Sequence, residues 1–475
     1  MKVIKNYLYN TSYQILVILA PLITTPYVSR VLGARASGIN SYTNGWVTFF
    51  CILGQLGVLL YGNREIAYHR EDKKERSRVF WGIAALQFCT VTLALLAYIV
   101  VVFLFSSTFR LYYLLQTFWI LAYGTDVSWY FMGMEDFRKT VVRNALVKFA
   151  SIALIFIVVH QENDLWKYIL ILSVTQVLGN LAMWPYLRGQ ITWISPMQWK
   201  PLVHLYPSIL LFIPTIATQI YTVVNKLMLG SIGTSNAVGQ FTYADSIVKL
   251  TIAIVTSTGT VMLPHMAHLF SQKDYSGIRQ SLYVSFEFET AVAIPIAMGL
   301  MAIGLKLAPW FLGKQYVTSG YVIFLEAPAI IFIAYDNVVG TQYLMPIKRV
   351  KEYTLSVIMG ALVNILFNFI LISEYSAKGA AIATVISELS IAMVQFYFVH
   401  SEFEWAKMFN GIGRYFVSGL AMFVIVFQMN SNMSMTAIHL LIQIVVGVVV
   451  YVVMLFIVRA PILNKAKKLM NRRSV

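Results

Sequence analysis

The sequence contains few charged residues and no long polar stretch. Only 12% of its 475 residues are charged, whereas 59% are hydrophobic, and the mean hydropathy is +0.70. Folded soluble proteins need polar and charged groups to cover their surface, so this composition excludes an ordinary soluble protein. The longest polar stretch, residues 62–78, is also too short to form a soluble domain.

The sequence also lacks the motifs of enzymes and metalloproteins. Its two cysteines, Cys51 and Cys89, lie in apolar segments and are expected to be packing residues rather than a disulfide or a metal site. There is no Walker phosphate loop, no zinc-ligand spacing and no nucleophile elbow. We therefore predict no enzymatic activity, no cofactor and no metal, although a coupling ion (H⁺ or Na⁺) is left open.

Apolar segments long enough to cross a bilayer follow one another along the chain. A spanning helix needs roughly 20 such residues, and these segments lack the alternation of barrel strands. They predict an all-α polytopic membrane protein with about 14 transmembrane helices. The predicted spans cover residues 8–32, 38–61, 79–106, 109–132, 140–160, 166–187, 203–229, 237–268, 277–305, 316–345, 352–373, 377–400, 412–430 and 435–458.

The positive charges lie mainly on one side of these spans. Of the 36 Lys and Arg residues, 26 fall in alternate loops and at the termini, six in the other loops and four within spans. Cytoplasmic loops of membrane proteins carry such an excess. We predict a plasma-membrane protein with both termini in the cytoplasm. The net charge of +16 then requires no nucleic acid, and the basic tail is expected to contact anionic membrane lipids.

Two segments about 200 residues apart suggest an internal repeat. Residues 28–42 (VSRVLGARASGINSY) and 224–243 (VNKLMLGSIGTSNAVGQFTY) each contain one cation (Arg30 or Lys226), a glycine, and then Gly-x-x-x-Tyr. Transporters are often built from such repeats, with the substrate site between the halves. An even number of spans between the two segments predicts a parallel pseudo-twofold repeat. The predicted division is an N-terminal lobe at 1–200, a C-terminal lobe at 201–400, and two further spans with the basic tail at 401–475.

Ionisable residues within the predicted spans are the candidate site residues. Because a charge in hydrocarbon is costly, each should face a cavity or a partner. Four cations, Arg30, Lys148, Lys226 and Lys249, are suited to a diphosphate head group. Alternatives remain open for three of these cations. Arg30 and Lys226 could instead extend to the membrane interface. Lys249 could instead pair with Asp245 one helical turn earlier.

Several acidic residues also fall within or near the spans. They are Asp245, Glu287, Glu289, Glu326, Asp336 and Glu388. Of these, Asp245, Glu287, Glu326 and Asp336 are the candidates for binding a coupling ion or for neutralising the cations.

Several strings resemble one family of transporters. They are YGNREIAYHR at 61–70, DVSWYFMGMEDFRKTVVRN at 126–144, and QYLMPIKRVKEY at 342–353, followed by ALVNILFNFILI and KGAAIATVISEL. They resemble signatures of Wzx-type polysaccharide repeat-unit flippases of the multidrug/oligosaccharidyl-lipid/polysaccharide (MOP) exporter superfamily. The resemblance is strongest to those of Gram-positive capsule, exopolysaccharide and teichoic acid loci.

The resemblance implies a two-lobed MATE/MOP-like fold with a central cationic cavity. It implies an undecaprenyl-diphosphate-linked oligosaccharide as substrate, moved from the cytoplasmic to the outer leaflet, with the polymerase and glycosyltransferases of the same pathway as partners. Arg30 falls where the family often has a cavity cation, but the fuller basic set of lipid II flippases is missing. Arg64, Glu135 and Arg138 match loop motifs, and we interpret them as a cytoplasmic gate.

Two other classes of function remain as alternatives. A multidrug exporter of the same superfamily would use an acidic pocket, which Asp245 and Glu287 would supply. A scaffold that assembles glycan-synthesis enzymes would need no transport at all.

Overall fold

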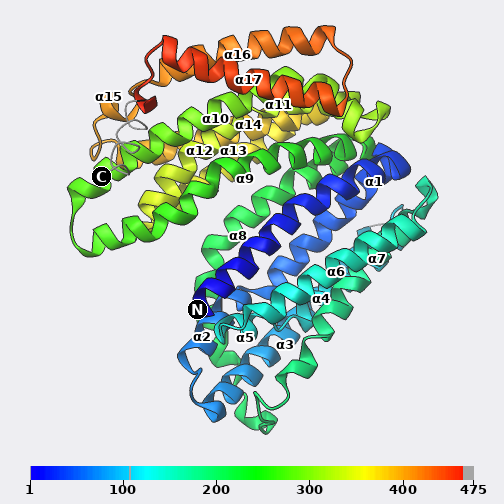
Figure 1. Ribbon diagram of the computed structural model, residues 1–475. Coiled ribbons are helices and arrows are strands. Elements are labelled where there is room, and N and C mark those ends of the chain that lie inside the picture. The colour runs from blue at the N-terminus through cyan, green and yellow to red at the C-terminus, as the bar shows by residue number, and fades with distance from the viewer. Residues whose placement is uncertain (1, 106–107, 464–475) are drawn as a thin grey trace. The chain divides into compact units, whose positions relative to one another are not determined.

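The computed structural model describes residues 2–105 and 108–463. Within these ranges, side chains are described except at residues 2–19, 105, 213–215, 217–222, 260 and 261. By its internal contacts the chain forms two compact units, Met1–Gly230 and Ser231–Val475. Both are helical (Figure 1), and the only β-pairing in the described ranges is an isolated bridge between Arg188 and Ile191.

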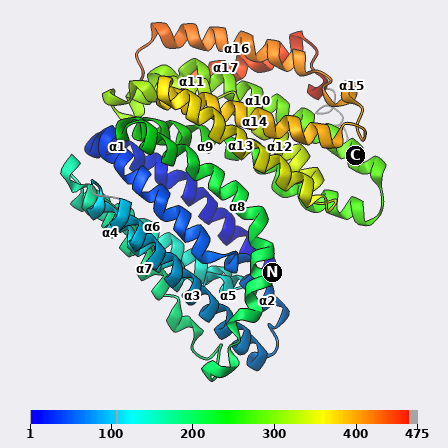
Figure 2. The same cartoon turned by 180° about the vertical axis from the view of Figure 1, so that it is seen from behind.

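Unit 1 contains eight α-helices. They are α1 (Lys2–Gln55), α2 (Val58–Tyr68), α3 (Lys73–Phe105), α4 (Arg110–Thr125), α5 (Ser128–Gly133), α6 (Phe137–Val158), α7 (Leu165–Leu181) and α8 (Pro201–Ile232). Helix α1 changes direction at Gly33, whose φ of 75° is accessible to glycine without the steric cost that a side chain adds. Helices α6 and α7 pack side by side, as the view from behind shows (Figure 2).

Aromatic side chains hold the inner helices of unit 1 together. The Trp129 indole is buried, stacks on the Phe80 ring with the centroids 5.3 Å apart, and donates a hydrogen bond to Gln87 Oε1 at 3.0 Å. Helix α2 approaches Trp129 closely at Gly62, where an added Cβ would lie 2.6 Å from the ring. The DVSWYFMG string therefore forms part of the core of this unit.

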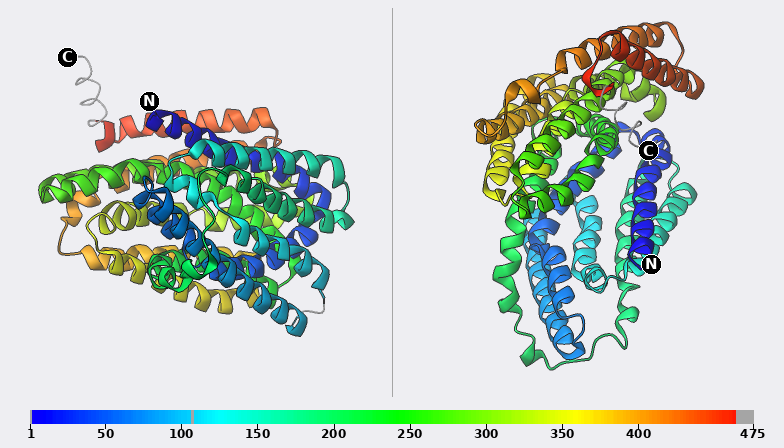
Figure 3. Two further views of the ribbon diagram at one scale, coloured as in Figure 1. Left: turned by 90° about the horizontal axis from the view of Figure 1, so that it is seen from below. Right: turned by 60° about the vertical axis from the view of Figure 1, so that its left-hand side comes forward.

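The described residues of unit 2, which end at residue 463, contain nine α-helices and one π-helix. They are α9 (Ser235–Ser271), α10 (Tyr275–Leu312), α11 (Val317–Glu326), α12 (Ala329–Asp336), the π-helix η5 (Asn337–Leu344), α13 (Val350–Tyr375), α14 (Ala377–Val399), α15 (Trp405–Met408), α16 (Ile412–Asn432) and α17 (Ala437–Ile457). Helices α16 and α17 form a pair that packs on α10 (Figure 3). Pro328 separates α11 from α12, and the two segments meet at a bend of 47°.

The helices confirm an all-α polytopic membrane protein. In the described ranges, ten helices are long and apolar enough to cross a membrane, or eleven if the bent pair Lys314–Glu326 and Ala329–Leu344 is one span. Each of the 14 predicted segments is mostly helical, but α1 runs through the first two of them and α4 has only 16 residues. The number of crossings therefore stays a prediction.

The predicted division into lobes also stays a prediction. The sequence assigns α8 to a C-terminal lobe beginning at residue 201, whereas the structure groups α8 as far as Gly230 with unit 1. Gly230 on α8 packs so closely on Tyr42 of α1 that an added Cβ would lie 2.0 Å from the ring. The basic tail at 464–475 lies outside the described residues.

Candidate functional site

Four ionisable side chains from three helices gather in unit 2. Asp245 and Lys249 come from α9, Glu326 from the last residue of α11, and Glu388 from α14. We call these four residues the acid cluster. Lys249 Nζ lies 2.8 Å from Asp245 Oδ2, and the Glu326 carboxyl group lies near Asp245. Glu388 is close enough to interact electrostatically with both Lys249 and Glu326.

Local sequence and helix packing together position the acid cluster. A spacing of four residues puts Asp245 and Lys249 on the same face of α9. Pro328 ends the α11 segment, which leaves Glu326 at the bend, and α11 packs against both α9 and α14. The three carboxyl groups therefore converge because of helix contacts.

The acid cluster contains three buried carboxyl groups. Asp245, Glu326 and Glu388 are exposed at only 5%, 2% and 6%, and Lys249 is ion-paired with Asp245. Burying charge without compensation costs several kcal/mol per ion. The arrangement is chemically suited to taking up and releasing a proton.

One oxygen of the acid cluster lacks a partner. Among the described residues, the buried Oε2 of Glu326 makes no hydrogen bond. Buried polar atoms in folded proteins are nearly always satisfied. Elsewhere too, no group of three or more His, Cys, Asp or Glu side chains in the described ranges is placed to hold a metal ion.

Another buried carboxyl group, that of Glu289, lies on α10, outside the acid cluster. Glu289 is fully buried, and its Oε1 accepts hydrogen bonds from Asn337 Nδ2 at 2.8 Å and from the side chains of Gln342 and Thr258. Asn337 and Gln342 both belong to the π-helix η5, a helix type found frequently at functional sites. Sequence reasoning named Glu289 and Glu388 as intramembrane acids but did not select them as candidates.

The remaining predicted acids have neutral partners. Glu287 Oε1 accepts a hydrogen bond from the Tyr415 hydroxyl at 2.8 Å, which joins α10 to α16. Asp336, at the end of α12, accepts one from Gln395 of α14. These contacts give each of the two acids a role in holding helices together.

Three of the four predicted cations lie in unit 1 and one in unit 2. Arg30 is exposed on α1, Lys148 is half-buried on α6 and Lys226 is half-buried on α8. Lys148 makes no hydrogen bond or ion pair with the described residues. Lys249 belongs to the acid cluster, so the structure supports its predicted pairing with Asp245. That the four cations together bind one substrate remains a prediction.

The three predicted gate residues, Arg64, Glu135 and Arg138, do not contact one another in the ion pairs of the described residues. Glu135 does form an ion pair between adjacent loops, but its partner is Arg70, with Nη1 3.0 Å from Oε1. Arg64 instead contacts its neighbour Glu65 at 3.3 Å, and Arg138 lines a pocket between α6 and α7. Arg70 lies in the string YGNREIAYHR, from which the sequence prediction selected Arg64 instead.

The fold defines a multi-pass membrane protein. The solved structure described as "Lipid II flippase MurJ, inward closed conformation" has the same fold, with a TM-score of 0.68. The two sequences are 15% identical, and the match covers 89% of this chain and 96% of that one. An inward-facing multidrug resistance MATE transporter of the MOP superfamily matches with a TM-score of 0.61 at 13% identity, covering 81% and 97%. These similarities confirm the predicted MATE/MOP-like fold.

The chain belongs to the polysaccharide biosynthesis protein family, whose sequence profile matches residues 3–270. A relative from Shigella dysenteriae, described as "Putative O-antigen transporter", is 23% identical over 383 residues, which cover 79% of this chain and 94% of that protein. The predicted resemblance to Wzx-type flippases is thereby confirmed, whereas the Gram-positive subtype stays a prediction.

Proposed function

We propose that this protein is a flippase that moves an undecaprenyl-diphosphate-linked oligosaccharide from the cytoplasmic to the outer leaflet by alternating access. The observation that carries the proposal is the family match over residues 3–270 in a chain with a flippase-like fold. The related O-antigen transporter supports a glycan cargo. A polysaccharide repeat unit or a teichoic acid precursor fits this description.

The substrate's lipid chain has a suitable binding surface in unit 2. An apolar pocket of about 510 Å³ is lined by α9, α10, α16 and α17, including Pro295, Met422, Gly447 and Tyr451. Glycine at position 447 leaves space between α17 and α16, where an added Cβ would lie 3.2 Å from a Val426 methyl group. A polyprenyl chain is apolar and flexible, so it can follow the apolar lining of such a pocket.

The acid cluster supports proton coupling of this transport. It contains three buried carboxyl groups, and one oxygen of Glu326 makes no hydrogen bond with the described residues. The same contacts argue against the multidrug exporter alternative. Asp245 is paired with Lys249 and Glu287 is bonded to Tyr415, so neither is left as an open acidic pocket for a cationic drug.

Export of glycan by variants of the two repeat cations tests the proposal. We expect Arg30→Ala and Lys226→Ala to reduce surface polysaccharide to background in a strain that depends on this gene, because a diphosphate head group needs cationic contacts. The measurement is cell-surface glycan by immunoblot, with membrane insertion checked by the yield of folded protein. Arg35→Ala, which removes an exposed cation from the same helix, is the matched control and should retain export.

Normal polymer output from both variants would exclude these cations from substrate binding. Resistance to dyes on expression of the wild-type chain, with unchanged surface glycan, would instead favour the multidrug exporter. Full activity after the predicted lobes are joined by engineered cross-links would favour a scaffold.

A further inference from the structure

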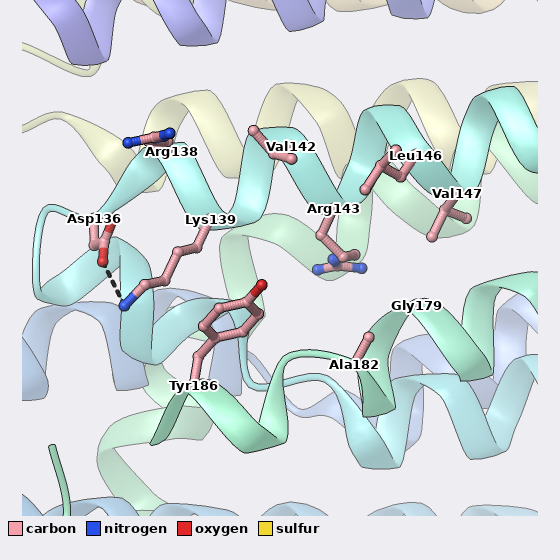
Figure 4. A pocket seen from close by; sticks show the side chains of 10 residues that line it. All are labelled: Asp136, Arg138, Lys139, Val142, Arg143, Leu146, Val147, Gly179, Ala182 and Tyr186. Carbon is pink, nitrogen blue, oxygen red and sulfur yellow. Dashed lines mark ion pairs between the residues drawn. The ribbon is translucent and has the colours of Figure 1, made fainter. Parts of the chain in front are cut away.

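A pocket between α6 and α7 of unit 1 combines positive charge with an apolar wall. It has a volume of about 560 Å³. Its charged and aromatic residues lie at the start of α6 and just after α7 (Figure 4). The residues that line it are Asp136, Arg138, Lys139, Val142, Arg143, Leu146, Val147, Gly179, Ala182 and Tyr186.

The charged end of the pocket carries excess positive charge. Three cations, Arg138, Lys139 and Arg143, line it with one acid, Asp136. Asp126, which does not line the pocket, lies behind Arg143, so the three cations still exceed the two acids. Lys139 Nζ lies 2.8 Å from Asp136 Oδ2 and 5.5 Å from the centre of the Tyr186 ring. Figure 4 shows the side chains of Lys139 and Arg143 directed from α6 toward α7. An anion that enters here meets cations held in place by neighbouring side chains.

Arg143 is fixed in position at the bottom of the charged end. Its side chain is only 8% exposed. Nη1 donates to Asn180 Oδ1 at 2.5 Å, Nη2 lies 3.8 Å from Asp126 Oδ1, and Asn180 in turn donates to the Ala122 carbonyl. These contacts orient the guanidinium before any ligand binds. Arginine groups held in this way recognise phosphate by directed hydrogen bonds.

The other wall of the pocket is apolar and open to the surroundings. Val142 and Leu146 follow Arg138 at helical spacing and are exposed at 45% and 64%. Gly179 lets α7 approach α6 closely, because an added Cβ would lie 2.2 Å from a Val147 methyl group. A soluble phosphate would leave this wall uncovered. A ligand with a phosphate and a hydrocarbon chain would cover both parts.

We propose that this pocket binds the phosphate head group of an anionic phospholipid of the cytoplasmic leaflet, with its acyl chain along Val142 and Leu146. The excess of Lys and Arg in the adjoining loops places this end of α6 on the cytoplasmic side. Basic pockets between transmembrane helices on that side are suited to such head groups. The bound lipid would be a resident ligand, separate from the transported glycan, and would stabilise the contact between α6 and α7.

Thermal stability of the full-length protein in detergent, titrated with lipid, tests this proposal. The probes are phosphatidylglycerol, phosphatidylcholine, a polyprenyl phosphate and inorganic phosphate. For the wild type we expect phosphatidylglycerol to raise the melting temperature saturably, with little effect of phosphatidylcholine. In the double variant R138Q/K139Q, the half-saturating concentration should rise about tenfold or more, since each cation near a lipid surface contributes substantially to binding.

The control variant K73Q/K74Q removes two exposed cations from the start of α3 in the same unit. It gives the same change in net charge outside the pocket and should shift the half-saturating concentration less than twofold. Arg138→Gln alone, at an exposed position, keeps the Lys139–Asp136 pair and should shift it about threefold. This single variant provides the answer if the double variant does not fold.

Four outcomes would overturn the proposal. The first is an equal shift of the half-saturating concentration in the pocket and control variants, and the second is no preference for phosphatidylglycerol over phosphatidylcholine. The third is full stabilisation by inorganic phosphate alone. The fourth is a tenfold preference for polyprenyl phosphate over phosphatidylglycerol. The third would make the pocket a free-phosphate site, and the fourth would make it a substrate site.

Discussion

Buried carboxyl groups are the residues of this chain whose placement has the greatest energetic consequence. Glu326 and Glu289 each have one buried oxygen that makes no hydrogen bond with the described residues, and each lies in a membrane-spanning segment. Such groups are costly and are therefore expected to be functional. Of the two, Glu326 lies among other charged groups, whereas the other oxygen of Glu289 is surrounded by neutral donors.

Glu326→Gln should separate proton coupling from folding. The amide keeps the size of the side chain but cannot exchange a proton, so we expect a folded, membrane-inserted protein whose glycan export falls to background. Export and melting temperature in detergent are the two measurements. Glu374→Gln, an exposed acid on α13, is the control and should behave as the wild type. Export at the wild-type level in the Glu326 variant would remove this residue from the coupling mechanism.

At the scale of elements, close helix contacts depend on glycines. Gly320 of α11 faces the backbone of α10, where an added Cβ would lie 2.9 Å from Leu305 Cα and 3.0 Å from the Gly304 carbonyl oxygen. Backbone atoms cannot move aside as a flexible side chain can. The position of Glu326, on the same helix, depends on this contact.

Gly320→Ala should therefore destabilise unit 2. Overpacking typically costs about 1–3 kcal/mol, which should appear as a lower melting temperature in detergent. Gly413→Ala on α16 is the matched control, because nothing lies within 4 Å of the added Cβ. There, alanine should be neutral or stabilising by roughly 0.5–1 kcal/mol. Equal melting temperatures for the two variants would mean that α10 and α11 adjust to the added methyl group.

The ion pair between Arg70 and Glu135 joins the loop after α2 to the loop before α6. Both side chains are partly exposed, at 37% and 53%, so the pair should contribute less than about 1 kcal/mol. We expect Arg70→Glu to lower stability slightly and the exchange R70E/E135R to restore it. Melting temperatures of the two single variants and the exchange give the coupling. The same series on Arg64 should show no coupling to Glu135.

At the scale of the whole molecule, loop charge predicts the orientation in the membrane. A reporter that is active only in the cytoplasm should work when fused after residue 348 or at the C-terminus, and should fail after residue 376, between α13 and α14. Alkaline phosphatase fusions at the same positions should give the opposite pattern. The physical reason is the excess of Lys and Arg in the inner loops. A C-terminal fusion that is active only outside would require an odd number of crossings.

Hydropathy and charge in the sequence alone determined the class of protein and the positions of most helices. These properties act within about 20 residues, the length that spans a bilayer, so they can be read locally. The pairing of Lys249 with Asp245 was predictable for the same reason, since one helical turn joins them. The boundaries that failed to match, such as the long α1, reflect a kink at Gly33 in place of a loop.

Tertiary structure decided which distant residues meet. Asp245, Glu326 and Glu388 converge because α11 packs between α9 and α14, and no local pattern encodes that contact. Arg70 rather than Arg64 reaches Glu135 because of how the two loops fold. Likewise, Lys139 and Arg143 line one pocket with Tyr186 only because Gly179 lets α6 and α7 approach. Hydropathy specifies that a helix is in the membrane, whereas side-chain packing specifies its neighbours.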